Sequence, residues 1–225
     1  TDLFSCKRHD VRPGKTGLSC TAAHQVLPDM RILIAIILFI SLAGCGATLK
    51  PVKPDATTGL FSTTVGIAPS DIEVAERFDP AYRRMLFINV KSNWGYLETI
   101  DYFQTSIEHL GTFEQVLTRK DIDQKIIAWH LQDKVSDVSN LLGLNLLSKQ
   151  IGNFLILDVS NWWKGGYHYE GSLQAMDAST GKTVFKTTLQ AFNWDGLDAS
   201  LFRPLLNAFV LWTKNELPGP QPGSK

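Results

Sequence analysis

Between Arg84 and Glu216 the chain alternates short apolar runs of strand length with longer stretches whose apolar residues recur at helical spacing. Runs rich in β-branched and other apolar residues predict strands, and apolar residues repeated every three or four positions predict the buried faces of helices. The predicted strands are 85–90, 113–118, 154–159, 167–177 and 183–194, and the predicted helices are 96–110, 121–129, 141–151 and 201–216. This order, β-α-β-α-α-β-β-β-α, predicts an α/β fold in which a single mixed β-sheet is packed with helices.

Glycines mark the ends of several predicted elements. Gly111 stands where the first helix needs a left-handed cap, and Gly152 separates the helix 141–151 from the strand that follows it. Gly181 supplies the positive φ of a tight turn between the last two strands. We therefore expect those two strands to pair antiparallel.

An uncharged apolar stretch, Ile32 to Ala43, follows Met30-Arg31 and ends in small residues. A basic start, an apolar middle shorter than the roughly 20 residues of a membrane-spanning helix, and a small-residue exit are typical of a secretion signal. We therefore predict a signal peptide at 30–44. Residues 1–29 precede the expected start and are interpreted as translated upstream sequence or a disordered leader.

The four residues Leu42-Ala43-Gly44-Cys45 resemble the lipobox of bacterial lipoproteins. The resemblance implies that the thiol of Cys45 is joined to diacylglycerol, that the peptide bond before it is cut, and that acyl chains such as palmitate anchor the mature protein. The alternative is an ordinary apolar helix that happens to end in cysteine. Because Gly46, and not aspartate, follows Cys45, the resemblance favours the periplasmic face of the outer membrane.

The segment after Cys45 has the composition of a linker. Between Gly46 and Pro80 there are prolines at 51, 54, 69 and 80 and many threonines, serines and glycines, as in extended tethers. We predict a lipidated flexible tether at 45–83, the α/β domain at 84–216 and a disordered Pro/Gly-rich tail at 217–225. A tether of this length would hold the domain well away from the lipid.

Charge and cysteine content exclude several classes of function. Lys plus Arg equals Asp plus Glu at 22 each, so no basic excess is present to neutralise phosphates, and nucleic acid is not an expected partner. The three cysteines, Cys6, Cys20 and Cys45, all lie in the first fifth of the chain, so no disulfide can staple the domain that follows.

Motifs predict no catalytic site. The spacings of a nucleophile elbow, a phosphate-binding loop and a zincin helix are absent from the sequence. His109, His130 and His168 are scattered without a second ligand at helical or strand spacing. Asp121 and Asp123 flank a helix start, and Asp121 is the predicted cap of that helix. We expect no catalytic residue, no metal and no cofactor.

The most unusual surface candidate is the segment 161–169, in which four aromatic residues flank a diglycine. Adjacent strand residues point to opposite faces of a sheet, so at most one of Trp162 and Trp163 can lie in the core. Either one tryptophan packs beneath the carboxy-terminal helix and the other is half-buried at an edge, or the segment is a recognition patch, since aromatic residues are enriched in protein interfaces. The predicted partner-binding residues are Trp162, Trp163, Tyr167, Tyr169 and, if the strands pair in sequence, Trp194.

Two passages resemble a known family. They are the run 147–157, Leu-Ser-Lys-Gln-Ile-Gly-Asn-Phe-Leu-Ile-Leu, and the run 176–185, in which two residues separate Asp177 from Thr180-Gly181. Both are similar to the small α/β domain shared by curli-export lipoproteins, the lipoprotein activators of penicillin-binding proteins, and the amino-terminal domain of TolB. The resemblance implies binding and assembly in the cell envelope without catalysis. The pore-forming branch is disfavoured because the chain has no room for two long amphipathic hairpins, and the long tether fits the branch that reaches through peptidoglycan.

The sequence therefore predicts a non-enzymatic lipoprotein that acts as a protein-binding adaptor or assembly factor in the cell envelope. Its expected partners are the membrane, held through Cys45, and an envelope protein. Two rivals stay open. An envelope hydrolase acting on glycan would bring two carboxyl groups to a cleft at a separation of roughly 5 to 10 Å, and a homo-oligomer would act as a scaffold or secretion component.

Overall fold

The computed structural model describes residues 49–63, 65–92, 96–135, 137–193 and 196–217, which form one mixed six-stranded sheet with the order β1-β6-β5-β4-β2-β3. The strands are β1 (Ile72–Ala75), β2 (Leu86–Ser92), β3 (Val116–Leu117), β4 (Leu155–Gly165), β5 (His168–Asp177) and β6 (Thr183–Phe192), and the helices are α2 (Tyr96–Glu108), α3 (Arg119–Ala128), α4 (Leu141–Ile151) and α5 (Arg203–Thr213). The predicted fold class is confirmed, and the elements predicted between Arg84 and Glu216 occur in the predicted order.

Several predictions concern other parts of the chain. The signal peptide, the lipid-bearing Cys45, Trp194 and the tail 218–225 lie outside the described residues.

Parallel pairing holds one half of the sheet, and antiparallel pairing holds the other. β2 pairs parallel with β3 and with β4. β4, β5 and β6 form an antiparallel meander, and β1 adds antiparallel to the outer edge of β6. The turn between β5 and β6 has Gly181 at φ +73°, so the expected antiparallel hairpin is confirmed.

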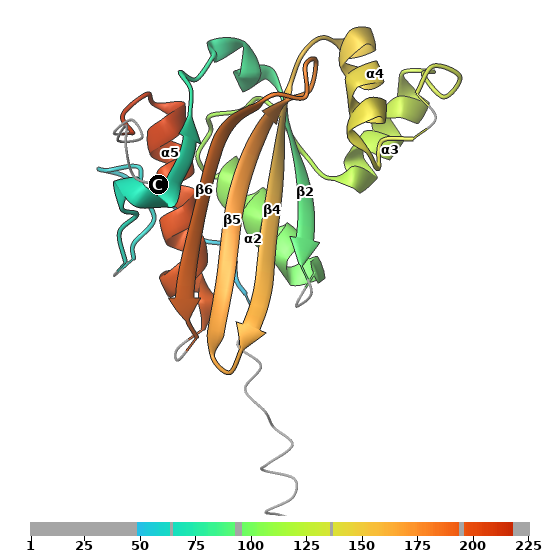
Figure 1. Ribbon diagram of the computed structural model, residues 1–225. Coiled ribbons are helices and arrows are strands. Elements are labelled where there is room, and N and C mark those ends of the chain that lie inside the picture. The colour runs from blue at the N-terminus through green and yellow to red at the C-terminus, as the bar shows by residue number, and fades with distance from the viewer. Residues whose placement is uncertain (1–48, 64, 93–95, 136, 194–195, 218–225) are drawn as a thin grey trace, which may run out of the picture. The chain divides into compact units, whose positions relative to one another are not determined.

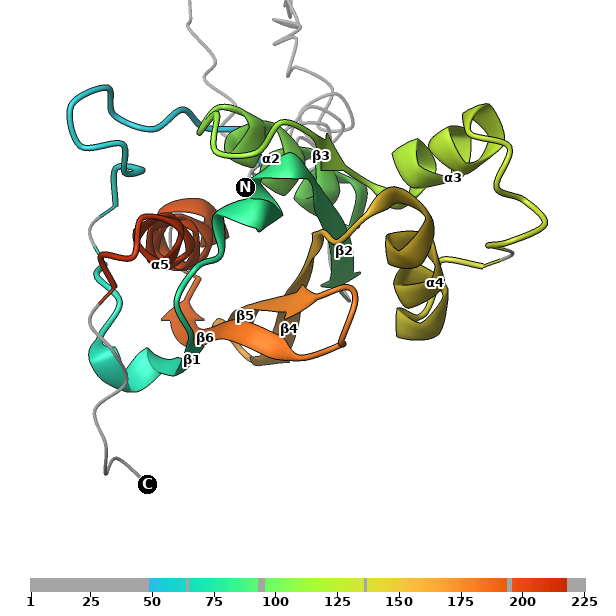
Figure 2. The ribbon, with the colours of Figure 1, turned by 90° about the horizontal axis from the view of Figure 1, so that it is seen from above.

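Helices cover the two faces of the sheet unequally. α2 and α5 lie against one face, where residues such as Phe103 and Phe209 are fully buried in the main core (Figures 1 and 2). α3 and α4 lie on the other side and form a smaller core with Phe87 and Ile156. The remainder of that second face carries polar side chains, including the ion pair of Asp158 with Lys91 at 2.7 Å. We call this part the open face of the sheet.

The folded part of the chain begins earlier than the predicted boundary at residue 84. Phe61 and Phe78 are 2% and 1% exposed in the main core, and β1 lies within the segment that the sequence analysis assigned to the tether. The backbone of Phe61 is bracketed by the side chain of Asn207, which accepts from its N–H at 2.7 Å and donates to its carbonyl at 2.8 Å. A proline-rich segment can pack in this way because side chains satisfy the backbone groups that a regular element would pair.

Two boundaries within the domain also differ from the prediction. The strand expected at 113–118 is reduced to β3, because Phe113 packs as a core residue against the ring of Phe209, with centroids 6.0 Å apart. The predicted cap of α3 was wrong by three residues. Thr118 precedes α3, and Asp121 is its third residue, where it accepts from the backbone N–H and the hydroxyl of Thr118 at 2.8 and 2.7 Å.

Asp177, at the end of β5, ties the β5–β6 turn to distant parts of the chain. Its carboxylate accepts from the hydroxyl of Tyr82 at 2.8 Å, the amide of Asn153 at 2.6 Å and the backbone N–H of Thr180 at 2.8 Å. Burial disfavours the charged carboxylate, but hydrogen bonds from Ser179, Asn153 and Tyr82 outweigh it and hold the pKa of Asp177 well below its ordinary value of 3.8.

The substitution Asp177→Asn tests this network. It should lower the free energy of unfolding at pH 7 by about 2 kcal/mol, because hydrogen bonds to a charged acceptor are lost and amide hydrogens face other donors. A group whose folded pKa is depressed contributes stability above its unfolded pKa and loses it as pH falls. Urea unfolding should therefore show the gap between wild type and variant closing below about pH 4; a gap independent of pH would contradict this role.

Candidate functional site at the tip of the β4–β5 hairpin

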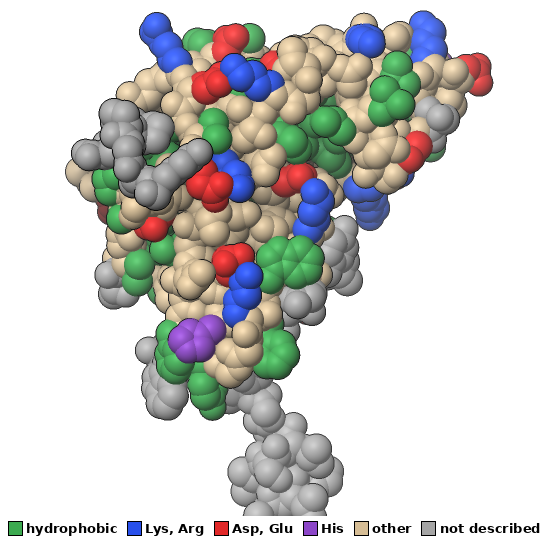
Figure 3. Space-filling view, viewed as in Figure 1, with side chains coloured by type: hydrophobic (Ala, Val, Ile, Leu, Met, Phe, Trp, Pro, Cys, Tyr) green, Lys and Arg blue, Asp and Glu red, His purple; other side chains and the backbone are tan. Residues whose placement is uncertain are grey.

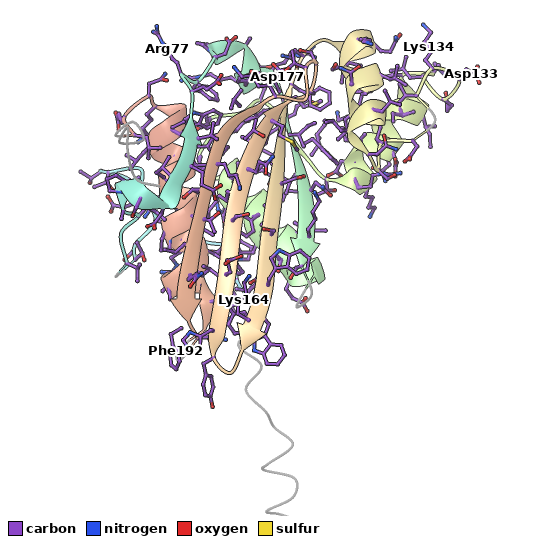
Figure 4. The ribbon with its side chains drawn as sticks, in the orientation of Figure 1. Arg77, Asp133, Lys134, Lys164, Asp177 and Phe192 are labelled. Carbon is purple, nitrogen blue, oxygen red and sulfur yellow. The ribbon has the colours of Figure 1, made fainter. Side chains whose placement is uncertain are left out.

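Aromatic side chains lie together at one end of the sheet, where β4 ends, β5 begins and β6 ends. The β4–β5 turn passes through Gly165 and Gly166, with φ of +111° and +57°, values that favour glycine. In Figure 4, Lys164 and Phe192 lie at this end and Asp177 lies at the other. Pairing sets His168 opposite Phe192.

Four large side chains at this end are exposed to solvent. Trp162, Trp163, Tyr167 and Phe192 are 42, 55, 56 and 48% exposed, and His168 beside them is exposed as well. We call these five residues the aromatic tip. Figure 3 shows hydrophobic side chains and a histidine gathered at the lower end of the molecule. Neither tryptophan lies in the core, so the alternative in which one packs beneath the carboxy-terminal helix is not what the structure shows.

Ring contacts hold the aromatic tip together. The ring of Phe192 lies 5.5 Å from that of Tyr167 and 5.2 Å from that of His168, the latter edge to face. The indole N–H of Trp163 donates to the carbonyl of Gly166 at 2.9 Å. These contacts orient the rings before any partner binds, which lowers the entropic cost of association.

The other predicted partner-binding residues differ in their placement. Tyr169 is half-buried and packs against the main core, so it supports the base of the hairpin. Trp194 is outside the described residues. The residue before it, Asn193, lies beside the β4–β5 turn, because its backbone N–H donates to the carbonyl of Tyr167 at 2.7 Å.

Phe192 was not among the residues predicted for the site from the sequence. Its position along β6 could have identified it. Phe192 is separated by an even number of residues from Lys186, Thr188 and Gln190, so it points to the same face as these polar side chains, away from the main core. Phe192 is therefore an exposed aromatic residue on the open face of the sheet.

Polar groups flank the aromatic residues on the open face. Trp162 pairs across the strands with Glu170, and Glu170 pairs with Gln190. The carboxylate of Glu170 forms an ion pair with Lys164 at 3.0 Å and accepts from the amide of Gln190 at 3.2 Å. An exposed network of charged and polar side chains therefore flanks the aromatic tip on the open face.

Asn161 lies at the base of the hairpin and is 1% exposed, yet neither atom of its amide has a hydrogen-bond partner among the described residues. Its neighbour across the strands is Gly171. A Cβ on Gly171 would lie 3.0 Å from Leu205 and 3.1 Å from Leu201, so the absence of a side chain lets these leucines pack directly on the strand. Asn161 faces the same side of the sheet as Gly171 and is buried there without a polar partner among the described residues.

The residues considered for chemistry are dispersed. His109 lies 3.1 Å from the carbonyl of Val52, and Asp121 belongs to the start of α3. No group of three or more potential metal ligands occurs within the described part of the chain. Two carboxylates, Asp123 and Asp137, do line a hollow of about 210 Å³ beside α3.

Those two carboxylates are held by one cation. Arg119 binds Asp123 at 3.0 Å and Asp137 at 3.4 Å. Hydrogen bonds from the side chain and backbone of Ser139 lower the pKa of Asp137. A glycosidase acid needs a raised pKa, so Asp137 is poorly suited to that role.

Comparison with known proteins finds similarity to solved structures at low sequence identity. No protein-family model matches the chain, and no curated protein sequence is similar to it. Three similar solved structures are the LpoB C-terminal domain from Salmonella enterica (12% identity, 50% of this chain and 85% of that chain, TM-score 0.34), the lipoprotein GNA1162 from Neisseria meningitidis (9%, 48% and 81%, 0.30) and the PelC dodecamer from Paraburkholderia phytofirmans (12%, 65% and 96%, 0.33). The predicted resemblance to bacterial envelope lipoproteins is confirmed as a likeness of fold.

Across the described ranges, no helix is both long and apolar enough to cross a membrane.

Replacing Asn161 by leucine tests whether its amide is truly unsatisfied. Asn161→Leu should raise the free energy of unfolding by about 1 to 3 kcal/mol, because a buried amide without partners pays its desolvation cost and leucine has a similar shape. Chemical denaturation of the two proteins measures the change. A less stable Asn161→Leu protein would show that the amide is satisfied in solution.

Proposed function

We propose that this protein is a non-enzymatic, lipid-anchored adaptor of the bacterial cell envelope that binds another protein through its aromatic tip. The observation that carries the proposal is the exposure of Trp162, Trp163, Tyr167 and Phe192 together at one end of the sheet. The domain has two filled cores without them, so their exposure serves no packing purpose. Clustered exposed aromatic side chains mark interaction sites.

The anchor in this proposal is Cys45, acylated after the signal peptide is removed and held at the periplasmic face of the outer membrane. The lipobox at 42–45 supports it. The fold likeness to envelope lipoproteins agrees with this setting. No cofactor takes part in the proposed function.

The adaptor is favoured over the hydrolase by the state of the carboxylates. The pair that lines a hollow, Asp123 and Asp137, is held in ion pairs with a single cation, Arg119. Glu170, which lies closest to the aromatic tip, is engaged by Lys164 and Gln190. In both arrangements the carboxylates are ion-paired with a basic side chain, whereas glycoside hydrolysis needs a protonated carboxylic acid beside a second carboxylate that can act as base or nucleophile.

The double substitution Trp163→Ala and Tyr167→Ala tests the site. Truncating aromatic anchors at the centre of an interface costs about 2 kcal/mol or more, so capture of the partner should fall by more than roughly tenfold. The measurement is chemical crosslinking in living cells of tagged, full-length protein, followed by mass spectrometry. The thermal midpoint should stay nearly unchanged, because both side chains are more than half exposed.

Trp129→Ala is the matched control, since Trp129 is also exposed but lies after α3 and away from the hairpin. Cys45→Ser reports whether capture depends on the anchor. Equal capture by the double variant would remove the claim that the aromatic tip is the site. Recovery of copies of the same chain alone would replace the adaptor by a self-assembling scaffold.

A further inference from the structure

We infer that the aromatic tip works at the surface of the membrane that holds the lipid, and that its partner is a protein whose contact segment lies at that same surface. The inference rests on the proposed function and on acylation of Cys45. It follows from where the folded chain begins, because that point fixes how far the domain can move from its anchor.

The first described residues are held against the domain. Leu49 is half-buried and packs on the main core. The backbone N–H of Val52 donates to the hydroxyl of Ser106 at 3.1 Å, and the carbonyl of Val52 lies 3.1 Å from Nδ1 of His109. Both backbone groups of Val52 are thus tied to the carboxy-terminal half of α2 and the residue after it.

Little chain is left to separate the anchor from the domain. Only residues 46–48 lie between Cys45 and Leu49. Four peptide units, fully extended, span at most about 14 Å. Had 45–83 been a free tether, the same calculation would allow about 130 Å. The mature domain therefore stays next to the bilayer and does not reach across the periplasm.

The aromatic tip lies at the end of the domain where this chain begins. In Figure 1 the described chain starts, in blue, behind the lower part of the sheet, and the β4–β5 turn is at the lower end of the same view. With Cys45 acylated, a connection of at most four peptide units would keep this end of the domain near the membrane. Tryptophan and tyrosine suit this zone because each joins an apolar ring to a polar N–H or O–H.

Polar groups beside the aromatic tip favour a protein as the occupant. Glu170, Lys164 and Gln190 form an exposed polar network on the open face, beside Trp162. A protein can present complementary charged and hydrogen-bonding groups to such a network in a defined arrangement, which mobile lipid headgroups do not provide. The partner that fits is an integral or anchored protein of the same membrane, presenting a segment at the headgroup level.

Spacers inserted between Ala47 and Thr48 test the inference in the full-length, acylated protein. A rigid helical spacer of 30 residues, six Glu-Ala-Ala-Ala-Lys repeats, lifts the domain by about 45 Å. A Gly/Ser spacer of equal length is the control, since it lets the domain return to the surface. Crosslinked capture of the partner should fall more than about tenfold with the rigid spacer and only a few-fold with the flexible one.

Equal capture with the rigid spacer would overturn the inference while leaving the adaptor in place, provided capture still depends on Trp163 and Tyr167. Capture that is insensitive to those two residues would instead remove the proposed site. Vesicles of phosphatidylethanolamine and phosphatidylglycerol with brominated acyl chains test the lipid itself as the occupant. Strong quenching of tryptophan fluorescence that the Trp163→Ala, Tyr167→Ala variant abolishes would show that the tip binds lipid, and would overturn the choice of a protein.

Discussion

The hydrogen bonds that the Asn207 side chain makes to both backbone groups of Phe61 hold an irregular segment against α5 as a neighbouring strand would. Burying a backbone segment without such partners costs several kcal/mol. Related contacts extend the effect along the chain: Arg203 donates to the carbonyl of Ser62 at 2.9 Å, and the N–H of Phe78 donates to the Asn215 side chain at 2.8 Å. Helix α5 and the residues at its ends therefore provide the hydrogen-bond partners that hold the first part of the domain in place.

The packing of this first part of the domain bears on the proposed anchor at Cys45. With residues 49–63 and 65–83 in the folded domain, three residues instead of nearly forty would set the reach of the domain from an acylated Cys45. The position of the aromatic tip is fixed relative to the core, because β4 and β5 run continuously from the core to the tip. The Asp177 network fixes one end of these strands, and the rings of Tyr167 and Phe192 order the other.

Much of the fold was predictable because its signals are local. The helix Leu141–Ile151 has its predicted bounds, since the apolar period and Gly152, at φ +88°, mark both its face and its end. The segment 49–83 was not predictable in this way. Phe61 and Phe78 are isolated apolar residues among prolines and polar residues, and the partners of their backbone groups lie 146 and 137 residues away.

The candidate site was predictable only in part for a similar reason. Adjacent tryptophans beside a diglycine pointed to Trp162 and Trp163, but periodicity alone does not say how far the helices cover a strand. The structure shows that Leu201 and Leu205, before and within α5, pack over Gly171. Asn161, opposite Gly171, is buried, while the two tryptophans beyond it remain exposed. Phe192 joins them through strand register, which is a property of the pairing and not of the local sequence.

The central claim is that residues 49–63 and 65–83 belong to the folded domain and would keep it close to an acylated Cys45. Amide hydrogen exchange of the mature, acylated protein, resolved to peptides covering Phe61 and Phe78, tests it most directly. The account predicts that these amides exchange orders of magnitude more slowly than in an unstructured peptide and open together with α5. Exchange of the whole segment at the rate of a free chain, with α5 still protected, would contradict it.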